Sequence, residues 1–289
     1  MKPNPQKEKE VLFSIPPVLH GTACEGCGAL PAADALMEVL GKDTVVVVPA
    51  SCLATFSLSY SHSAWKVPLV HSLFESGPAL ATGIKRAYEF LGKRAHVVCF
   101  AGDAGTMDIG FQALSGAAGR NEDIIHICYD NEVAMNTGGQ ATSSSPHLAL
   151  TPTTPGGMPF LKKDGPKIMA AHNIPYVATA SVSHLEDWKS KLRKASEIKG
   201  FRYIHVLSPC PISWGYNYEQ TREVACSAVE TGLWMLYEVE QGRFRLTYRP
   251  ASRRPVKDYF TAQERYRLLK TKEVASIQRQ VDNAWRALS

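Results

Sequence analysis

Three apolar, strand-like runs in this sequence each lead into a residue that could do chemistry. Cys52 follows Val45–Pro49, Asp103 follows His96–Ala101, and Asn131 follows Asp123–Tyr129. In an open parallel sheet the carboxyl ends of the strands lie along one edge, and ligands bind there, where the strand order reverses. The sequence therefore predicts that a thiol, a carboxylate and an amide converge on one crevice.

Asp103 and Asn131 have the residue types and the spacing of a metal-diphosphate site. They are 28 residues apart, which fits one turn, one helix and one adjacent parallel strand. A carboxylate, an amide oxygen, a backbone carbonyl (here that of Val133) and two phosphate oxygens suit the octahedral oxygen shell of Mg²⁺. Taken alone, Asp103 has an ordinary alternative role as a helix N-cap, and Asn131 has one as a turn residue. Their spacing, and the Asn-Thr-Gly-Gly that follows, favour the metal site.

Four of the seven cysteines could hold an iron–sulfur cluster. Cys24 and Cys27 form a CxxC whose neighbouring glycines free the backbone to bend round a metal. Cys52 follows Cys27 by 25 residues, and Cys210 ends a strand between two prolines that make a rigid turn. Four such thiolates suit a [4Fe–4S] cluster, while structural zinc or a redox pair are open alternatives for a CxxC. The expected place of Cys52 beside the crevice favours iron–sulfur.

The other cysteines have simpler explanations. Cys226 lies in a predicted helix and competes with Cys210 for the role of fourth ligand, although a small buried thiol on a helix face is its ordinary interpretation. Cys99 and Cys128 lie inside apolar strands and are expected in the core. An odd number of cysteines in a long chain without a secretory signal argues against a disulfide framework.

At these residues the sequence resembles thiamine-diphosphate enzymes, and specifically the β subunit of the pyruvate:ferredoxin oxidoreductase group of 2-oxoacid oxidoreductases. The segments that carry the resemblance are Gly102–Gly110, Gln112–Gly116, Cys128–Glu132 and Asn136–Gly138. Ala104 stands where the family motif usually has a second glycine, and Gly105 follows it. The resemblance extends from about Thr22 through Tyr248.

The resemblance implies a set of cofactor ligands. Thiamine diphosphate would be held through Mg²⁺ by Asp103, Asn131 and Val133, and Cys24, Cys27, Cys52 and Cys210 match the family's cluster ligands. Asn136 would lie near the reacting end of the cofactor, where it is the expected catalytic residue. The residues expected to contact the cofactor are Gly102, Asp103, Ala104, Gly105, Thr106, Asn131, Val133, Asn136 and Thr137.

The resemblance also implies a reaction and partners. Thiamine diphosphate would support oxidative decarboxylation of a 2-oxo acid, with pyruvate as the default, and coenzyme A would capture the acyl group. Electrons would reach a ferredoxin through the [4Fe–4S] cluster. An α-type subunit would carry the pyrimidine-binding domain, and a further iron–sulfur subunit or domain would carry relay clusters. The chain is therefore expected to be active only in a hetero-oligomer.

Two other functions are compatible with parts of the pattern. A nonredox thiamine-diphosphate lyase or decarboxylase subunit with structural zinc would keep Asp103 and Asn131 but would have no use for Cys52 beside the cofactor. An assembly or electron-transfer subunit would bind a cluster and no thiamine diphosphate.

The elements that must position these residues alternate along the chain. Apolar strands between helices indicate βαβ units and an α/β fold with a mostly parallel, doubly wound sheet. The predicted strands are Thr44–Pro49, His96–Ala101, Asp123–Tyr129, Tyr176–Ala180 and Tyr203–Leu207. The predicted helices are Leu30–Leu40, Pro78–Leu91, Ile109–Gly119, Lys167–His172, His184–Ile198 and Gln220–Thr231.

Two segments depart from this alternation. Thr137–Pro166 is rich in Gly, Ser, Thr and Pro and is expected to cover the site or contact a partner. After Thr231, Trp234–Glu240 and Arg243–Tyr248 are typical of a β-hairpin, and a helix-prone tail follows from about Thr261. We therefore expect a domain over residues 1–232 that carries the cofactor and iron–sulfur sites. Residues 233–289 would be a hairpin and basic tail that contact another subunit.

Composition narrows the class of protein. At 45% hydrophobic and 20% charged residues, the chain is typical of a soluble globular protein. No apolar run approaches the ~20 residues that span a bilayer, and Met1–Glu10 lacks the apolar core of a secretory signal. We expect a cytoplasmic protein with no membrane contact.

The net charge of +5 is concentrated in Arg243–Ser289, which has 12 Lys or Arg against 4 Asp or Glu. A solvated basic extension is the simpler interpretation and a docking surface for an acidic partner the sharper one. Acidic residues interrupt the tail and no recognition motif is present, so nucleic acid is not an expected partner.

Overall fold

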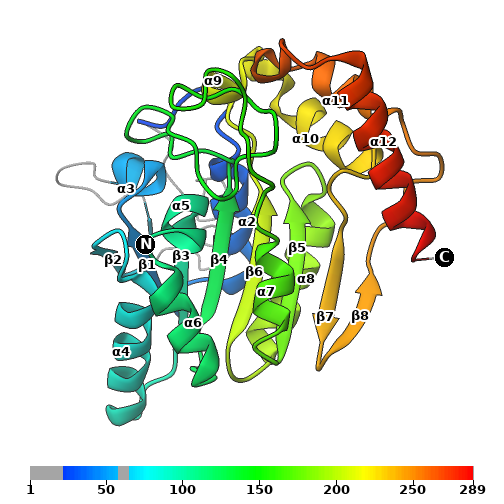
Figure 1. The fold of residues 1–289 in the computed structure, drawn as a ribbon. Helices are drawn as coiled ribbons and strands as arrows, with labels where there is room; N and C mark the ends of the chain where they lie inside the picture. The colour runs from blue at the N-terminus through cyan, green and yellow to red at the C-terminus, as the bar shows by residue number, and fades with distance from the viewer. Residues whose placement is uncertain (1–21, 58–64, 289) are drawn as a thin grey trace, which may run out of the picture.

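An eight-stranded sheet runs through the computed structural model, which describes residues 22–57 and 65–288 (Figure 1). The strand order is β2-β1-β3-β4-β6-β5-β7-β8. The first six strands in this order are parallel to one another. The strands are β1 (Thr44–Pro49), β2 (Leu69–Ser72), β3 (His96–Gly102), β4 (Ile125–Asp130), β5 (Tyr176–Ser181), β6 (Arg202–Leu207), β7 (Tyr237–Glu240) and β8 (Arg243–Leu246). The expected α/β fold with a mostly parallel sheet is confirmed.

Helices cover both faces of the sheet, as a doubly wound fold requires. Helices α2 (Ala29–Leu40) and α8 (Leu185–Glu197) pack together on one face. Helices α4 (Gly77–Phe90), α6 (Phe111–Gly119) and α7 (Gly165–Ala170) cover the face nearer the viewer in Figure 1. Alternate residues of one strand serve the two cores: Val46 and Val48 lie in the first and Val47 in the second. Burial on both faces explains why the strands are almost continuously apolar.

All five predicted strands are present, and all six predicted helices match α2, α4, α6, α7, α8 and α10 (Thr221–Glu230) to within two residues. Helix α6 begins two residues after the predicted Ile109, because the chain first forms the short helix α5 (Asp103–Met107) and then breaks. A Cβ on Gly110, at this break, would lie 1.9 Å from the carbonyl oxygen of Gly105. The close approach of these two backbone segments prevents one continuous helix.

Several short elements were not predicted. They are α3 (Cys52–Ser57), β2, α5, α9 (Pro211–Trp214), the 3₁₀ turns η1 (Tyr218–Gln220) and η2 (Glu264–Tyr266), and α11 (Val256–Thr261). Elements of three to six residues show little periodicity in a sequence. Met1–Glu10, on which the expectation about a secretory signal rests, lies outside the described residues.

Short elements and a long loop gather above the carboxyl ends of the parallel strands, at the top of Figure 1. The chain leaves β1 toward β2 and then returns to β3 on the other side of β1, so the strand order reverses between β1 and β3. Residues 137–164 contain only isolated bridges and lie over this edge. Thr142, Ser144 and Ser145 of this loop are buried, and Thr142 contacts Asp103, as expected of a covering segment. A partner contact by the same loop stays a prediction.

The predicted hairpin is present and extends the sheet, because β7 pairs antiparallel with both β5 and β8. Helix α12 (Thr271–Arg286) packs with α10 and α11 in a third hydrophobic cluster. Trp285 of α12 lies between two cations, with the guanidinium carbons of Arg249 and Arg253 at 5.6 and 5.7 Å from its ring centre. These contacts and the hydrogen bond from its indole to Gly232 (3.0 Å) anchor the tail. The division of the chain at residue 232 stays a prediction.

Candidate functional site

Asp103 and Asn131 meet at the edge of the sheet as predicted. Asp103 is the first residue of α5, directly after β3, and Asn131 directly follows β4. The two strands are neighbours, with Gly102 in register with Tyr129. Both polar residues are buried.

The side-chain amide of Asn131 lies close to two oxygen atoms that could bind a metal with it. The amide head of Asn131 lies 2.9 Å from Oδ1 of Asp103 and 2.6 Å from the carbonyl oxygen of Val133. With the amide oxygen turned toward them, the three oxygens are spaced like neighbouring ligands of a small, hard cation. With the amide nitrogen turned toward them, Asn131 would instead donate two hydrogen bonds. The donor set and its spacing fit Mg²⁺, which prefers oxygen ligands in an octahedral shell.

The surroundings of Asp103 disfavour its charged form, which a bound cation would stabilise. Burial, together with the nearby carboxylate of Asp130, raises the pKa of Asp103 well above its usual range. Thr142 opposes this effect by donating a hydrogen bond of 2.6 Å to Oδ2 of Asp103. Thr142 belongs to the covering loop and was not predicted. The concentration of Ser and Thr in that loop was the only signal in the sequence.

The small residues of the predicted phosphate segment are tightly packed. Gly105 faces Phe74, since an added Cβ would lie 3.1 Å from its ring, and Gly102 faces the hydroxyl of Tyr129 at 3.2 Å in the same way. Ala104 is buried as well. The hydroxyl of Thr106 contacts Nε2 of His126 at 3.1 Å in the core, so this hydroxyl is already engaged within the protein.

The four predicted cluster cysteines line one cavity. Cys24 and Cys27 lie in the turn before α2, Cys52 begins α3, and Cys210 precedes α9. They surround a cavity of about 200 Å³. The same cavity is lined by Tyr129, Asn131 and Asn136, so the cysteines and the metal-ligand turn share one opening.

These thiols raise the pKa of one another. Burial raises the pKa of Cys52 to about 12, and Cys27, Cys210 and Cys24 add to the rise. Burial likewise raises the pKa of Cys210 to about 11 and that of Cys27. Only a cationic centre among them would hold several of these groups as thiolates. Within residues 22–57 and 65–288, no three Cys, His, Asp or Glu side chains come close enough to hold a single metal ion. The sulfurs line a space rather than meet at a point.

The remaining cysteines lie elsewhere. Cys226 is on α10 and is not among the described residues that line this cavity. Burial raises its pKa, and Glu230 adds to the rise. Cys99 and Cys128 are fully buried in the sheet, as expected. Cys210 is therefore the one of the two rivals that lies with the other three thiols.

Asn136 lies at the rim of the cavity. Its Oδ1 accepts a hydrogen bond of 2.7 Å from Oγ1 of Thr55, which is on the helix that begins at Cys52. Thr137 is turned away, since its hydroxyl bonds Gln140 within its own turn. The side chain of Asn136 is exposed and thus available to a ligand.

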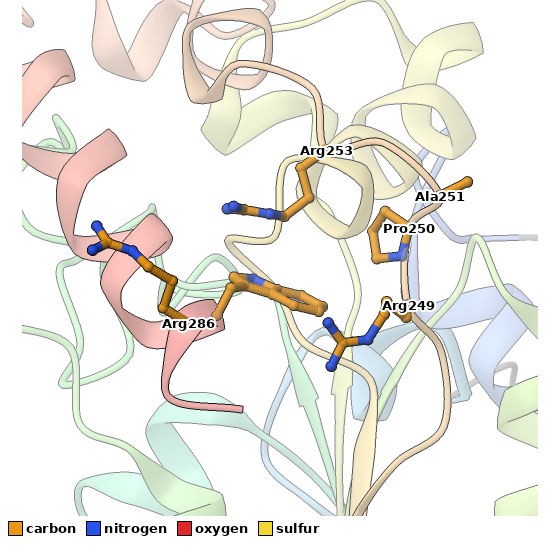
Figure 2. A pocket seen from close by; sticks show the side chains of 6 residues that line it. Arg249, Pro250, Ala251, Arg253 and Arg286 are labelled. Carbon is orange, nitrogen blue, oxygen red and sulfur yellow. The ribbon is translucent and has the colours of Figure 1, made fainter. Parts of the chain in front are cut away.

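A second cavity, of about 250 Å³, lies in the C-terminal region and shares no lining residue with the first (Figure 2). Arg249, Arg253 and Arg286 line it. Arg253 is ion-paired with Asp282 at 2.8 Å, and Arg249 and Arg253 both contact Trp285. Arg249 and Arg253 thus help to anchor the tail. The two interpretations of the basic extension stay predictions.

Several known proteins are similar to this chain. The model of the thiamine pyrophosphate enzyme C-terminal TPP-binding domain matches residues 50–206, which include Cys52, Asp103 and Asn131. Pyruvate synthase subunit PorB of Methanothermobacter marburgensis is 48% identical over 271 residues, covering 92% of this chain and 94% of that protein. Ketoisovalerate oxidoreductase subunit VorB of Pyrococcus abyssi is 38% identical and covers 92% of this chain and 90% of that protein.

A solved structure has the same fold. It is a 2-oxoglutarate:ferredoxin oxidoreductase from Magnetococcus marinus, with a TM-score of 0.59 and 22% sequence identity. The match covers 74% of this chain and 78% of that one.

Proposed function

The chain belongs to the β subunits of the 2-oxoacid:ferredoxin oxidoreductases, which are thiamine pyrophosphate enzymes, and we propose that it carries both the thiamine diphosphate and a [4Fe–4S] cluster. The observation that carries this proposal is the shared cavity. Four cysteines line it together with Asn131 and Asn136. An electron acceptor would thus lie beside the reacting cofactor.

The reaction that we assign is the oxidative decarboxylation of a 2-oxo acid. The acid and coenzyme A give an acyl-coenzyme A, CO₂ and a proton, and two electrons leave for ferredoxin. Pyruvate is the substrate that we favour, because the PorB subunit of Methanothermobacter marburgensis is 48% identical and the VorB subunit of Pyrococcus abyssi is 38% identical. Bound thiamine diphosphate supplies the electron sink for decarboxylation.

The chain's own residues would bind and orient the cofactor. Asp103, Asn131 and the carbonyl of Val133 would hold Mg²⁺, and Thr142 fixes the Asp103 carboxylate by its hydrogen bond of 2.6 Å. The exposed amide of Asn136, held by Thr55, would contact substrate or the reacting end of the cofactor. Cys24, Cys27, Cys52 and Cys210 would bind a cluster that accepts single electrons.

The nonredox alternative with structural zinc fits less well. A tetrahedral zinc site needs four ligands about 2.3 Å from one ion, so their sulfurs must crowd around a point. The cysteines here instead line a cavity, which suits a larger inorganic group. Membership of a thiamine pyrophosphate family argues against an assembly subunit that binds no thiamine diphosphate.

We infer that the active enzyme needs further subunits. The described residues form one sheet, so the pyrimidine end of the cofactor would be bound by an α-type subunit. A further iron–sulfur subunit or domain would pass electrons to ferredoxin. We expect the assembly to be cytoplasmic, and no helix in the described part of the chain is long and apolar enough to cross a membrane.

The experiment is an anaerobic visible spectrum of the assembled enzyme, recorded as several 2-oxo acids are added in turn with coenzyme A. Iron–sulfur absorbance should bleach most rapidly with pyruvate and only when thiamine diphosphate and Mg²⁺ are present. Bleaching that needs no thiamine diphosphate, or a protein that holds zinc and no iron, would contradict the proposal.

A further inference from the structure

The turn that carries two of the three oxygen donors contains a strained residue. Glu132, between Asn131 and Val133, has φ of +62°. This left-handed conformation costs a residue with a Cβ roughly 1–2 kcal/mol. It turns the chain so that Asn131 and Val133, on either side of Glu132, face the same place. Such strain persists only where the surroundings over-determine the conformation.

Four contacts hold Glu132 in place. Its backbone N–H donates to Oδ1 of Asp130 (2.9 Å), and its carbonyl accepts from the hydroxyl of Ser145 (2.7 Å). Its side chain is buried and ion-paired twice, from Oε1 to Lys162 (2.6 Å) and from Oε2 to Arg265 (2.7 Å). Backbone and side chain are thus both fixed.

Arg265 brings the C-terminal segment into this site. Its side chain is 3% exposed and lies in η2, far in sequence from the cofactor motifs. It donates to Gln263 (2.8 Å) and to the hydroxyl of Tyr259 (2.9 Å), so that its guanidinium has a fixed orientation. Its backbone carbonyl accepts from Leu150 of the covering loop (2.8 Å).

Arg265 also reaches Asn131 by a second route. Its guanidinium carbon lies 3.6 Å from the ring centre of Trp214. The indole N–H of Trp214 donates to the carbonyl of Asn131 at 2.8 Å. The same cation therefore supports the residues on both sides of the strained peptide.

Lys162 completes the charge balance. Its ammonium pairs with Asp130 and Glu132, each at 2.6 Å, so two carboxylates are matched by Lys162 and Arg265. Asp130 also contacts His205 at 2.7 Å. Buried ion pairs seldom add stability over apolar packing, and their best-attested use is to fix a conformation.

We propose that Arg265 and Lys162 are positioning residues for the metal. They hold Glu132 in the left-handed conformation so that Asn131 and Val133 present their oxygens to Mg²⁺. The inference rests on the proposed function. It adds that the tail after the hairpin, through Arg265, is part of the cofactor site as well as a possible subunit contact.

The test compares Mg²⁺ affinity in the assembled enzyme with saturating thiamine diphosphate, by titration calorimetry with Mg²⁺ alone as the titrant. Arg265→Met and Lys162→Met should weaken Mg²⁺ binding by about 10-fold or more, the usual effect of losing an outer partner of a metal ligand. Iron content, which reports the cysteine site, should stay at the wild-type value. The control is Arg267→Met at an exposed neighbour whose side chain donates to the Glu264 carbonyl, and it should bind Mg²⁺ like the wild type.

A methionine at residue 265 leaves a buried carboxylate half-paired and could prevent folding, so Arg265→Lys is the second variant. It keeps the charge but loses the planar fork, and it should weaken Mg²⁺ binding about three-fold or more. Wild-type Mg²⁺ affinity in Arg265→Lys, or in a folded Arg265→Met, would overturn the inference. If wild-type enzyme binds thiamine diphosphate without Mg²⁺, the proposed function itself fails.

Discussion

At the scale of single residues, the site combines groups that are costly to bury with a space for the cations that would offset the cost. Burial raises the pKa values of Asp103, Cys52 and Cys210. Asp130 adds to the rise at Asp103, and the neighbouring thiols add to it at the two cysteines. Each would favour its charged form only beside a positive centre. Cofactor binding should therefore release protons and add stability to the chain.

Asp103→Asn separates these two effects. Because burial disfavours the Asp103 carboxylate, the cofactor-free variant should be at least as stable as the wild type at neutral pH. Its Mg²⁺-dependent binding of thiamine diphosphate should fall by more than about 100-fold, beyond the effect of an outer partner. Thermal melting without cofactor and calorimetry with it are the two measurements. A variant that melts well below the wild type without cofactor would contradict this account of Asp103.

Cys210→Ser and Cys226→Ser form a matched pair. Cys210 lines the cavity with the other three thiols and Cys226 does not. After anaerobic reconstitution, Cys210→Ser should lose most of the iron bound by the chain, and Cys226→Ser should keep it. The opposite pattern in an iron assay would make Cys226 the fourth ligand.

At the scale of elements, the site depends on turns that bring distant segments into contact. Gly28 ends the CxxC turn, and its N–H donates to the carbonyl of Pro209 (3.1 Å), beside Cys210. A Cβ on Gly28 would lie 2.6 Å from the carbonyl carbon of Ser208. The spacing between the two cysteine segments is therefore set by the absence of a side chain.

Gly28→Ala should push the CxxC turn away from Cys210 and reduce bound iron by more than half. Gly83→Ala is the control, since Gly83 lies within α4 with open space at its Cβ position. That change should leave iron content unaltered and raise stability by about 0.5–1 kcal/mol. Equal iron content in both variants would show that the two turns can shift independently.

The start of β4 is held by an ion-pair cluster that makes stability depend on pH. Although burial alone would raise the pKa of Asp123, Lys85 and Arg202 lower it to about 2. Asp123→Asn should cost about 2 kcal/mol at pH 7, because one pKa unit corresponds to 1.36 kcal/mol. The contribution of Asp123 is complete above its unfolded pKa near 4, so the difference should shrink as pH falls from about 4 to about 2.

Urea unfolding of both proteins at several pH values measures this difference. Glu89→Gln, which removes an exposed pair with Arg86 (side chains 43% and 64% exposed), should change stability by less than about 0.5 kcal/mol. A difference between Asp123→Asn and the wild type that stays constant with pH would contradict the assigned pKa.

Long, periodic elements and the residues at their ends could be predicted from the sequence. Strand ends are marked by apolar runs, so the amino-acid pattern alone was enough to assign Cys52, Asp103 and Asn131 to one edge of the sheet. Thr142, Lys162, Trp214 and Arg265 could not be assigned, because their roles depend on contacts between residues 30 to 133 positions apart. The left-handed backbone of Glu132 could not be predicted either, because a Glu that follows an Asn does not indicate this conformation.

At the scale of the whole molecule, one sheet edge collects residues from nearly the full length of the chain. The cavity is lined from Thr22 to Pro211, and Arg265 supports it from the tail. The tail is fixed to the rest by Trp285 between Arg249 and Arg253. Under the proposed function Arg265 would couple the tail to the cofactor site, and its removal should weaken binding of Mg²⁺ there.

The most direct test of the central claim is anomalous diffraction at the iron edge from anaerobic crystals of the assembled enzyme with thiamine diphosphate and Mg²⁺. We predict iron peaks in the cavity between the sulfurs of Cys24, Cys27, Cys52 and Cys210, and the diphosphate bound through a metal at Asp103 and Asn131. A zinc signal among those sulfurs, or thiamine diphosphate bound away from that cavity, would contradict the account.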